Sequence, residues 1–379
     1  MSFKKIGSIG GQIGLPSGTK LVGSNSLVLV SSGISSLDDV LGGGLAVGTI
    51  LLVEEDRMTG YSQILQSIFE AQSVCSNHKL FVAKTGLETK KDLVLPKRID
   101  KQTPVSAEKS ADMKIAWRYN KSNPVAVDLN VKTSGSEQDT YCHEFDLSAS
   151  MNEGEIENAD VDIVNVYDMV KNNTVSGYSQ LFSKISQFVE NGYSSLDSSK
   201  QSGPRRIARI SLHSIGSAIW QQASDKEILE FFVGLKGLLR YSYAACMISI
   251  PSEAQGEKRK KSGLLRRIEK HCDSVVELES FEGGYVEGSR LLKLQKTKTK
   301  SNEEYHGLFH IHKLPCLNSL VPPASKLSIL ARSGGGSTNN LAFRLRRKKF
   351  SIETYHLPIE GGSSERRVPE SQSATKLDF

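Results

Sequence analysis

The sequence predicts an α/β fold built on a mainly parallel, twisted sheet flanked by helices, and three features support this prediction. The apolar run TILLV at residues 49–53 has the length and continuous hydrophobicity of a strand that is buried on both faces. A loop containing Gly60 follows, and then apolar residues recur at helical spacing between Ile64 and Phe69. Similar strand and helix segments alternate further along the chain, which is typical of sheets covered by helices.

The later elements are expected from the same two periodicities. One helix is expected over residues 178–189, and another begins at the capping box of Ser224 and Glu227 and continues to residue 239. Toward the C-terminus the alternation becomes that of antiparallel strands. The expected strands lie at 27–30, 79–84, 206–214 and 243–250, followed by the antiparallel group at 274–278, 291–294, 307–312 and 341–345.

Composition indicates a globular chain with loose segments. Of its 379 residues 38% are hydrophobic and 24% are charged, and no apolar run approaches the roughly 20 residues of a membrane span. We expect one domain over residues 27–360, with a polar insertion around 87–160 and flexible tails at 1–26 and 361–379. The net charge is only +6, but the basic residues are clustered, and such clusters are typical of a nucleic-acid partner.

The loop after the first strand has the setting of a phosphate-binding P-loop but lacks its chemistry. A working loop has the pattern G-x-x-x-x-G-K-[ST], in which a lysine reaches the outer phosphates. Here Gly60 and Ser62 fit, whereas Tyr61 stands in place of the lysine and Glu55 in place of the first glycine. Losing such a charge-assisted bond costs about 1.5–3 kcal/mol, and Arg57 is not where the lysine belongs. The sequence therefore predicts a degenerate nucleotide loop.

Residues 33–44 carry a further pattern, Gly33-x-x-x-Leu37-Asp38-x-x-Leu41 followed by three glycines. This pattern resembles the segment that opens the core of RecA-type ATPases. Together with the altered loop, the chain resembles the PAXNEB family over roughly residues 27–358. The segments that carry this resemblance most specifically are 33–53, 114–119, 141–147, 274–283, 305–315 and 341–358.

The resemblance implies that two further groups of an active ATPase are missing. The catalytic glutamate of such enzymes would follow the second strand, near residues 84–86, and no carboxylate stands there. The acidic metal ligand would end the next strand, where His213 stands instead. We expect His213 to be a strand-end side chain held by hydrogen bonds. No catalytic residue, metal or cofactor is therefore expected in this chain, and ATP could be bound only at the level of a ring of subunits.

The resemblance also implies partners and a role. Members of the PAXNEB family are similar to two further RecA-like subunits, Elongator proteins 5 and 6, with which they form a hetero-hexameric ring. This ring is a tRNA-binding accessory module of Elongator, a cytoplasmic and nuclear complex, linked to transcription elongation, that modifies the wobble uridine of tRNA. Two alternatives remain: an active RecA/KaiC-type ATPase acting on DNA, and a purely structural ring scaffold without affinity for RNA.

Two basic clusters are candidates for RNA contact. The first follows the strand at 243–250, where RecA-like rings present a loop to their axis, so its side chains would meet phosphates. A solvated charge run or a nuclear-import signal is the alternative. The first cluster comprises Lys258, Arg259, Lys260 and Lys261, with Arg266 and Arg267 beyond it, and the second comprises Arg344, Arg346, Arg347, Lys348 and Lys349.

Metal ligation is not expected from the cysteines and histidines. The five cysteines are scattered without a C-x-x-C pair, which favours a reducing compartment and argues against a zinc site. Cys142 and His143 are adjacent and would point in opposite directions on an extended segment. His306, His310 and His312 share one face at period two, but with no carboxylate clustered beside them in the sequence we expect a packed sheet face.

Overall fold

A computed structural model describes residues 15–22, 27–56, 59–99, 140–171, 176–190, 206–220, 223–251, 262–281, 305–323 and 341–355 of the chain. Its helices are α1 (Ser35–Val40), α2 (Tyr61–Cys75), α3 (Glu153–Asn158), α4 (Val166–Lys171), α5 (Gly177–Glu190), α6 (Asp225–Arg240) and α7 (Gly263–His271). Its strands are β1 (Thr19–Val22), β2 (Leu27–Val30), β3 (Leu45–Ala46), β4 (Ile50–Glu55), β5 (Lys79–Lys84), β6 (Pro96–Arg98), β7 (Phe145–Ser150), β8 (Val161–Asn165), β9 (Ala208–Leu212), β10 (Ala244–Pro251), β11 (Ser274–Ser280), β12 (Gly307–Lys313), β13 (Leu341–Leu345) and β14 (Phe350–Thr354).

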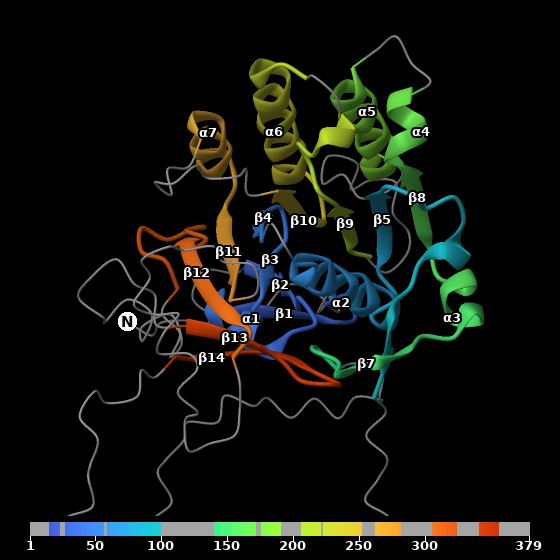
Figure 1. Cartoon of the computed structure of the whole chain (residues 1–379), viewed down its shortest axis with the longest axis vertical. Helices are drawn as coiled ribbons and strands as arrows, with labels where there is room; N and C mark the ends of the chain where they lie inside the picture. The colour runs from blue at the N-terminus through green and yellow to red at the C-terminus, as the bar shows by residue number, and fades with distance from the viewer. Residues whose placement is uncertain are drawn as a thin grey trace, which may run out of the picture.

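Strand β4 lies in the middle of the main sheet and is buried there, and this burial is what the sequence predicts. Within the described residues this sheet has nine strands in the order β14-β13-β12-β11-β4-β10-β9-β5-β8 (Figure 1). Leu51 and Val53 face a core shared with α2, while Ile50 and Leu52 face a second core shared with α5 and α6. The expectation of a mixed α/β fold with a mostly parallel sheet between helices is confirmed.

One strand of the expected antiparallel group is parallel instead. β11 pairs parallel with β4, while β12, β13 and β14 continue the sheet antiparallel. The reason is the connection: the chain passes from β10 through α7 into β11, and a helical crossover of this kind joins parallel strands. The expected strand at 291–294 lies outside the described residues.

The described ends of the expected polar insertion contain ordered elements. β6 and β7 form an antiparallel pair, and α3 follows directly. β2, where we expected the domain to begin, belongs to a separate sheet of three strands in the order β1-β2-β3. Among the described residues no helix has both the length and the apolar character needed to cross a membrane.

The glycine-rich segment closes around a buried carboxylate. Asp38 accepts hydrogen bonds from the backbone N–H and the hydroxyl of Ser32, both at 2.7 Å, and another from the Ser31 hydroxyl. The three glycines then turn with positive φ, and a Cβ on Gly42 would collide with Pro323 while one on Gly44 would collide with the Tyr141 hydroxyl. The pattern is thus needed for packing, because only glycine tolerates both the φ values and the close approach.

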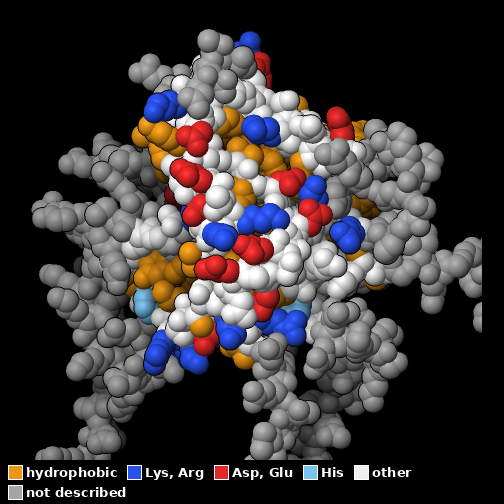
Figure 2. Space-filling view, turned by 90° about the vertical axis from the view of Figure 1, so that its right-hand side faces the viewer, with side chains coloured by type: hydrophobic (Ala, Val, Ile, Leu, Met, Phe, Trp, Pro, Cys, Tyr) orange, Lys and Arg blue, Asp and Glu red, His pale blue; other side chains and the backbone are white. Residues whose placement is uncertain are grey.

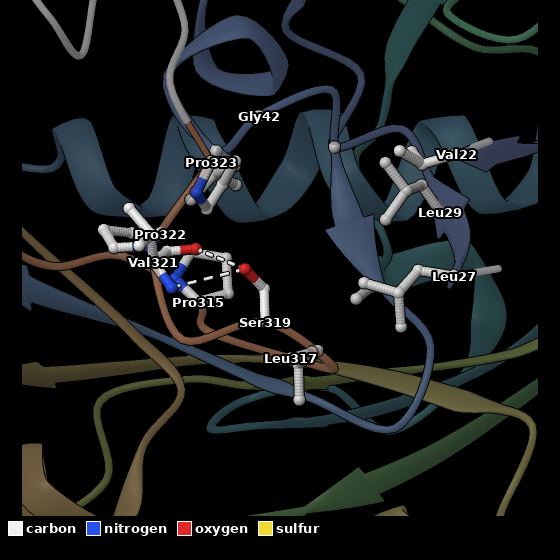
Figure 3. A pocket seen from close by; sticks show the side chains of 13 residues that line it. Val22, Leu27, Leu29, Gly42, Pro315, Leu317, Ser319, Val321, Pro322 and Pro323 are labelled. Carbon is white, nitrogen blue, oxygen red and sulfur yellow. Dashed lines mark hydrogen bonds between the residues drawn. The ribbon is translucent and has the colours of Figure 1, made fainter. Parts of the chain in front are cut away.

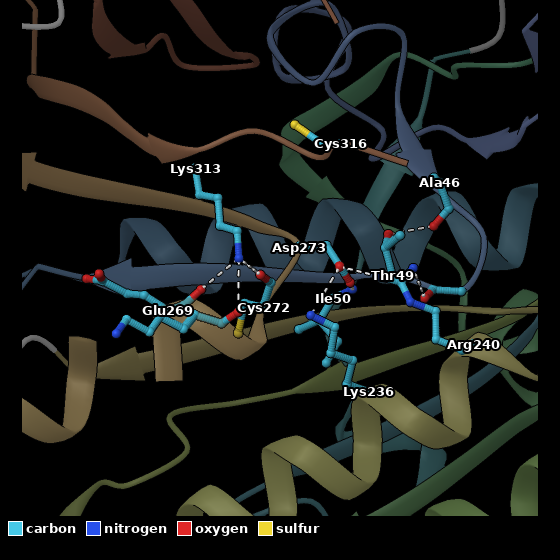
Figure 4. A network of polar contacts seen from close by, with 12 residues as sticks. Ala46, Thr49, Ile50, Lys236, Arg240, Glu269, Cys272, Asp273, Lys313 and Cys316 are labelled. Carbon is cyan, nitrogen blue, oxygen red and sulfur yellow. Dashed lines mark hydrogen bonds and ion pairs between the residues drawn. The ribbon is translucent and has the colours of Figure 1, made fainter. Parts of the chain in front are cut away.

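Asp273 connects the start of β4 to helix α6 (Figure 4). Its carboxylate accepts a hydrogen bond from the backbone N–H of Ile50 at 3.1 Å, hydrogen-bonds the Arg240 guanidinium and lies 3.7 Å from the Lys236 ammonium.

Beside Asp273, the ammonium of Lys313 donates to three carbonyls at the C-terminal end of α7, including that of Cys272 at 2.5 Å. Cations satisfy the free carbonyls at a helix C-terminus and interact favourably with its dipole.

A buried histidine is held neutral beneath the small sheet. The Nε2–H of His78 donates to the Ser17 carbonyl at 2.7 Å, and its Nδ1 accepts from the Arg209 guanidinium at 3.0 Å. Burial, with a contribution from the charge of Arg209, lowers the pKa of His78 from 6.5 to about 3. Both ring nitrogens therefore have partners only in the neutral form.

The Asp273 network predicts a large effect of a small substitution. Asp273→Asn should lower the free energy of unfolding by about 2–3 kcal/mol, because it replaces the buried carboxylate that pairs with two cations by a neutral amide. Chemical denaturation measures this change. Glu230→Gln is the matched control, since it breaks the exposed Lys226–Glu230 pair and should cost less than about 1 kcal/mol. Equal effects would contradict the assigned role of Asp273.

The state of His78 predicts a pH dependence. Because the pKa is lower in the folded chain than in the unfolded chain, its stabilising contribution is complete above about pH 6.5 and is lost as the pH falls toward 3. Denaturation at pH 7 and pH 5 should therefore show lower stability at pH 5. His78→Gln keeps a donor and an acceptor and should reduce this difference, leaving the contribution of His143, whose pKa burial lowers to about 4. An unchanged difference would contradict the prediction.

Candidate functional site

The loop between β4 and α2 lies at the carboxyl edge of the parallel strands, where α/β proteins commonly bind ligands. Its two described carboxylates are held by neighbouring hydroxyls. Glu55 accepts from the Ser214 hydroxyl at 2.8 Å, and Asp56 accepts from that of Thr59 at 2.9 Å. Arg57 lies outside the described residues. Acidic groups at this edge would repel the phosphates of a nucleotide.

Tyr61, the residue in place of the lysine, is the first residue of α2 and is only 8% exposed. Its ring packs edge-on against Phe343 of β13, with ring centres 4.9 Å apart, and lies 6.1 Å from the ring of His306. Ser62, which would hold the metal in a working loop, is buried as well. The start of α2 therefore packs against the C-terminal strands.

His213 lies directly after β9, and the expectation that hydrogen bonds hold it is confirmed. Its Nε2 lies 2.6 Å from the Glu70 carboxylate, which also accepts from the Ser211 hydroxyl at 2.6 Å. All three side chains are buried. At the end of β5, Gly86 donates its backbone N–H to Asn165, and the side chain at this strand end is the cation Lys84. RecA-type ATPases, which the chain resembles in sequence, carry acidic catalytic groups at the ends of these two strands. In this chain the strand ends carry His213 and Lys84.

A cleft of about 770 Å³ brings the start of α2 together with three cations. Gly60, Gln63 and Ser67 line one part, Lys84 lines another, and Arg346 and Arg347 come from the turn after β13. Ser148 and Ser150 of β7 line it too, together with apolar residues such as Val94, Leu95 and Leu345, and none of the described residues that line the cleft is acidic. A helix N-terminus, hydroxyls and guanidinium groups together suit an anion such as phosphate.

The structure divides the second basic cluster. Arg344 is buried, 3.2 Å from the Glu353 carboxylate and stacked over the Tyr305 ring. Lys348 pairs with Asp146 at 3.0 Å, and Lys349 lies 4.0 Å from Glu144. These pairings are why only Arg346 and Arg347 of this cluster line the cleft.

Of the first basic cluster and the two arginines beyond it, the structure describes only the two arginines. Lys258, Arg259, Lys260 and Lys261 are outside the described residues, while Arg266 and Arg267 are exposed on α7. In Figure 1 helix α7 lies well above strands β13 and β14. A single ligand touching α7 and the turn after β13 would have to span this separation.

Charge is balanced on the side of the molecule that carries β8 and α3. Figure 2 shows basic and acidic side chains interspersed there. Three ion pairs belong to this part of the fold: Lys79–Asp162 at 3.2 Å, Lys91–Glu157 at 3.4 Å and Arg206–Asp160 at 3.9 Å. The described residues of this side therefore carry both charges side by side.

A second, apolar pocket of about 330 Å³ lies between the small sheet and the segment after β12 (Figure 3). Val22, Leu27 and Leu29 line one wall, and Val321 and Pro323 line the other. The Ser319 hydroxyl holds the second wall in a turn by donating to the Val321 carbonyl at 2.9 Å. The lining lacks ionisable groups in the described residues.

The expectation that no carboxylate lies beside the histidines of β12 is wrong. His310 lies 2.7 Å from Glu279, and His312 lies 2.6 Å from Glu277. Pairing of β11 with β12 brings together residues more than thirty positions apart, which the sequence spacing does not reveal. His306 instead accepts the backbone N–H of Leu345 at 3.2 Å. His143 is buried against Gln72, and Cys142 is half-buried.

Sequence reasoning also missed the role of Lys84 in the cleft. Its position drew attention only because a glutamate is missing there. The signal that could have indicated this role is the position of Lys84 at the end of a predicted strand, since strand ends in α/β proteins lie beside helix starts. The contribution of Arg346 and Arg347 depends on the return of β13 to the same edge.

Comparison with known proteins gives consistent matches along the whole chain. The profile of the PAXNEB protein family matches residues 12–379. The chain is 34% identical to Elongator complex protein 4 of Xenopus laevis, covering 94% of this chain and 86% of that protein. It is 31% identical to Elongator complex protein 4 of Homo sapiens (90% and 79%) and 23% identical to that of Saccharomyces cerevisiae (92% and 77%). The chain belongs to the PAXNEB family.

Proposed function

We infer that this chain is a non-catalytic accessory subunit of an Elongator complex, in which it binds tRNA and supports modification of the wobble uridine. The observation that carries this proposal is the burial of Tyr61 against β13 at the position of the phosphate-binding lysine, in a chain whose relatives are named Elongator complex protein 4. Such a subunit would keep the α/β fold but would have no lysine at this position to bind the phosphates of a nucleotide.

The proposed assembly follows from the family resemblance. The chain would have a RecA-like core with a degenerate nucleotide site, and would form a hetero-hexameric ring with Elongator proteins 5 and 6. The ring would act in the cytoplasm and nucleus beside the catalytic subunits, with ATP bound only at ring level. Exposed apolar side chains such as Val94 (73%) and Leu320 (101%) are surface that a neighbouring subunit could cover.

The proposed RNA contact rests on the cations of the cleft. Arg346 and Arg347 lie beside the start of α2 and Lys84, and phosphate groups would meet guanidinium and ammonium groups together with backbone N–H groups. The exposed Arg266 and Arg267, with the run 258–261, form the second proposed contact. Because none of these groups reads base edges by its position, binding should be largely independent of sequence.

Removing the two cleft arginines tests the RNA contact. In the ring assembled with Elongator proteins 5 and 6, the double variant Arg346→Ala and Arg347→Ala should weaken tRNA binding. The slope of log affinity against log salt should flatten by about 0.7–0.9 for each phosphate that the variant no longer neutralises. Filter binding over a salt series measures both quantities.

The control is Lys184→Ala with Lys226→Ala, which removes two exposed lysines of α5 and α6. The same assay on alanine variants of 258–261 and of Arg266 and Arg267 apportions binding between the two clusters. If affinity and slope are unchanged in all basic-cluster variants, the chain is a ring scaffold without RNA contact. Loss of the ring itself would place the altered residues at a subunit interface.

Tyr61 tests the nucleotide site. Calorimetry should detect no micromolar ATP binding to the isolated chain, and Tyr61→Lys should not create it, because the acidic positions remain unfilled. This variant should instead lose about 2–4 kcal/mol of stability, since an ammonium would be buried between aromatic rings. Tyr61→Phe, the control, should lose about 1 kcal/mol or less. Micromolar ATP affinity in the unaltered chain would favour the active ATPase instead.

A further inference from the structure

Three adjacent strands of the main sheet bring two carboxylates and an imidazole together. β4 pairs parallel with β11, and in that register Glu54 lies directly opposite Glu277. β12 lies on the other side of β11, and its His312 is 2.6 Å from Glu277. One donor atom from each of Glu54, Glu277 and His312 lies within 4.8 Å of the others.

The surroundings of Glu54 favour a cation beside it. Glu54 is fully buried, and the preceding residues on its side of β4, Ile50 and Leu52, belong to an apolar core. Like charges directly opposite each other on neighbouring strands destabilise a sheet, and the repulsion grows where water is excluded. A cation held between the two carboxylates would offset this repulsion.

We propose that Glu54, Glu277 and His312 form a binding site for a divalent transition-metal cation, with zinc as the representative. Zinc takes carboxylate oxygens at about 2.0–2.2 Å and imidazole nitrogens at about 2.0–2.1 Å. Donor atoms around such an ion are roughly 3–3.5 Å apart. Rotation of the three side chains would bring their donor atoms from within 4.8 Å to this separation. Three protein ligands leave a position for water or for a group from a partner.

The path of the ion and its effect on the fold follow from exposure and topology. The His312 side chain is 30% exposed and the Glu277 side chain 19%, so the ion would enter from their side and meet Glu54 last. The bound ion would cross-link β4, β11 and β12, where the sheet changes from parallel to antiparallel pairing.

The chain contains a matched comparison. His310 and Glu279 form the same kind of pair at 2.7 Å on the same two strands, and the rings of His310 and His312 stack 6.3 Å apart. Within the described residues, no third donor completes a set around His310 and Glu279. A site that needs all three ligands should therefore respond to changes at His312 and not to the same changes at His310.

The test uses the full chain, freed of metal with a chelator, and titration with Zn²⁺ by calorimetry. We expect one ion to bind per chain and to raise the melting temperature. His312→Ala and Glu277→Gln should each weaken binding at least tenfold, while His310→Ala and Glu279→Gln should leave it within about twofold. His312 is at the surface, so its variant should remain folded, which circular dichroism verifies.

Co²⁺ supplies an independent readout. Bound at this site it should show the visible absorption of oxygen and nitrogen ligation without the intense near-ultraviolet band of a thiolate, and the visible signal should disappear in His312→Ala. A thiolate band would assign the ion to one of the five cysteines and overturn the proposal. Absence of Zn²⁺ binding to the unaltered chain, or equal losses in the His310 and His312 variants, would overturn it as well.

Discussion

Burial of β4 on both faces is the constraint on which the rest of the fold depends. Its residues alternate between two separate cores, so each face needs its own cover. Helix α2 covers one face together with β13 and β14, and α5 and α6 cover the other. The Asp273 carboxylate holds the start of this strand to α6. At its other end the strand carries the Glu55 carboxylate, which accepts a hydrogen bond from Ser214.

The carboxyl end of β4 leads into polar contacts and into the aromatic packing at the start of α2. Hydroxyls hold the carboxylates of the loop, and Tyr61 joins the aromatic packing of β13. The return of β13 to this edge also brings Arg346 and Arg347 to the cleft beside α2. The return of β13 that buries the Tyr61 ring thus also brings to α2 the two arginines of the proposed RNA contact.

The charged residues of this chain fall into groups with distinct physical roles. Some, such as Arg344 and Arg209, are buried and hold elements together through aromatic stacking and hydrogen bonds. Others are balanced by partners on the side that carries β8 and α3. The proposed contacts use cations of the cleft and of α7, and the proposed metal site uses carboxylates whose close approach follows from strand pairing. The modest net charge of the chain therefore says little about where its charged residues act.

The sequence by itself determined the α/β class, the strand β4 and the helices α2, α5 and α6. It also showed that Glu55, Tyr61 and His213 differ from the pattern of a RecA-type ATPase. Both are possible because periodicity and local motifs are properties of neighbouring residues. Only the tertiary structure decided that β11 pairs parallel with β4, that Tyr61 lies against Phe343, and that Lys84, Arg346 and Arg347 line one cleft. It also placed Glu277 and Glu279 beside the histidines of β12. These contacts join residues far apart in the chain, and strand order and register, which no local pattern encodes, bring them together.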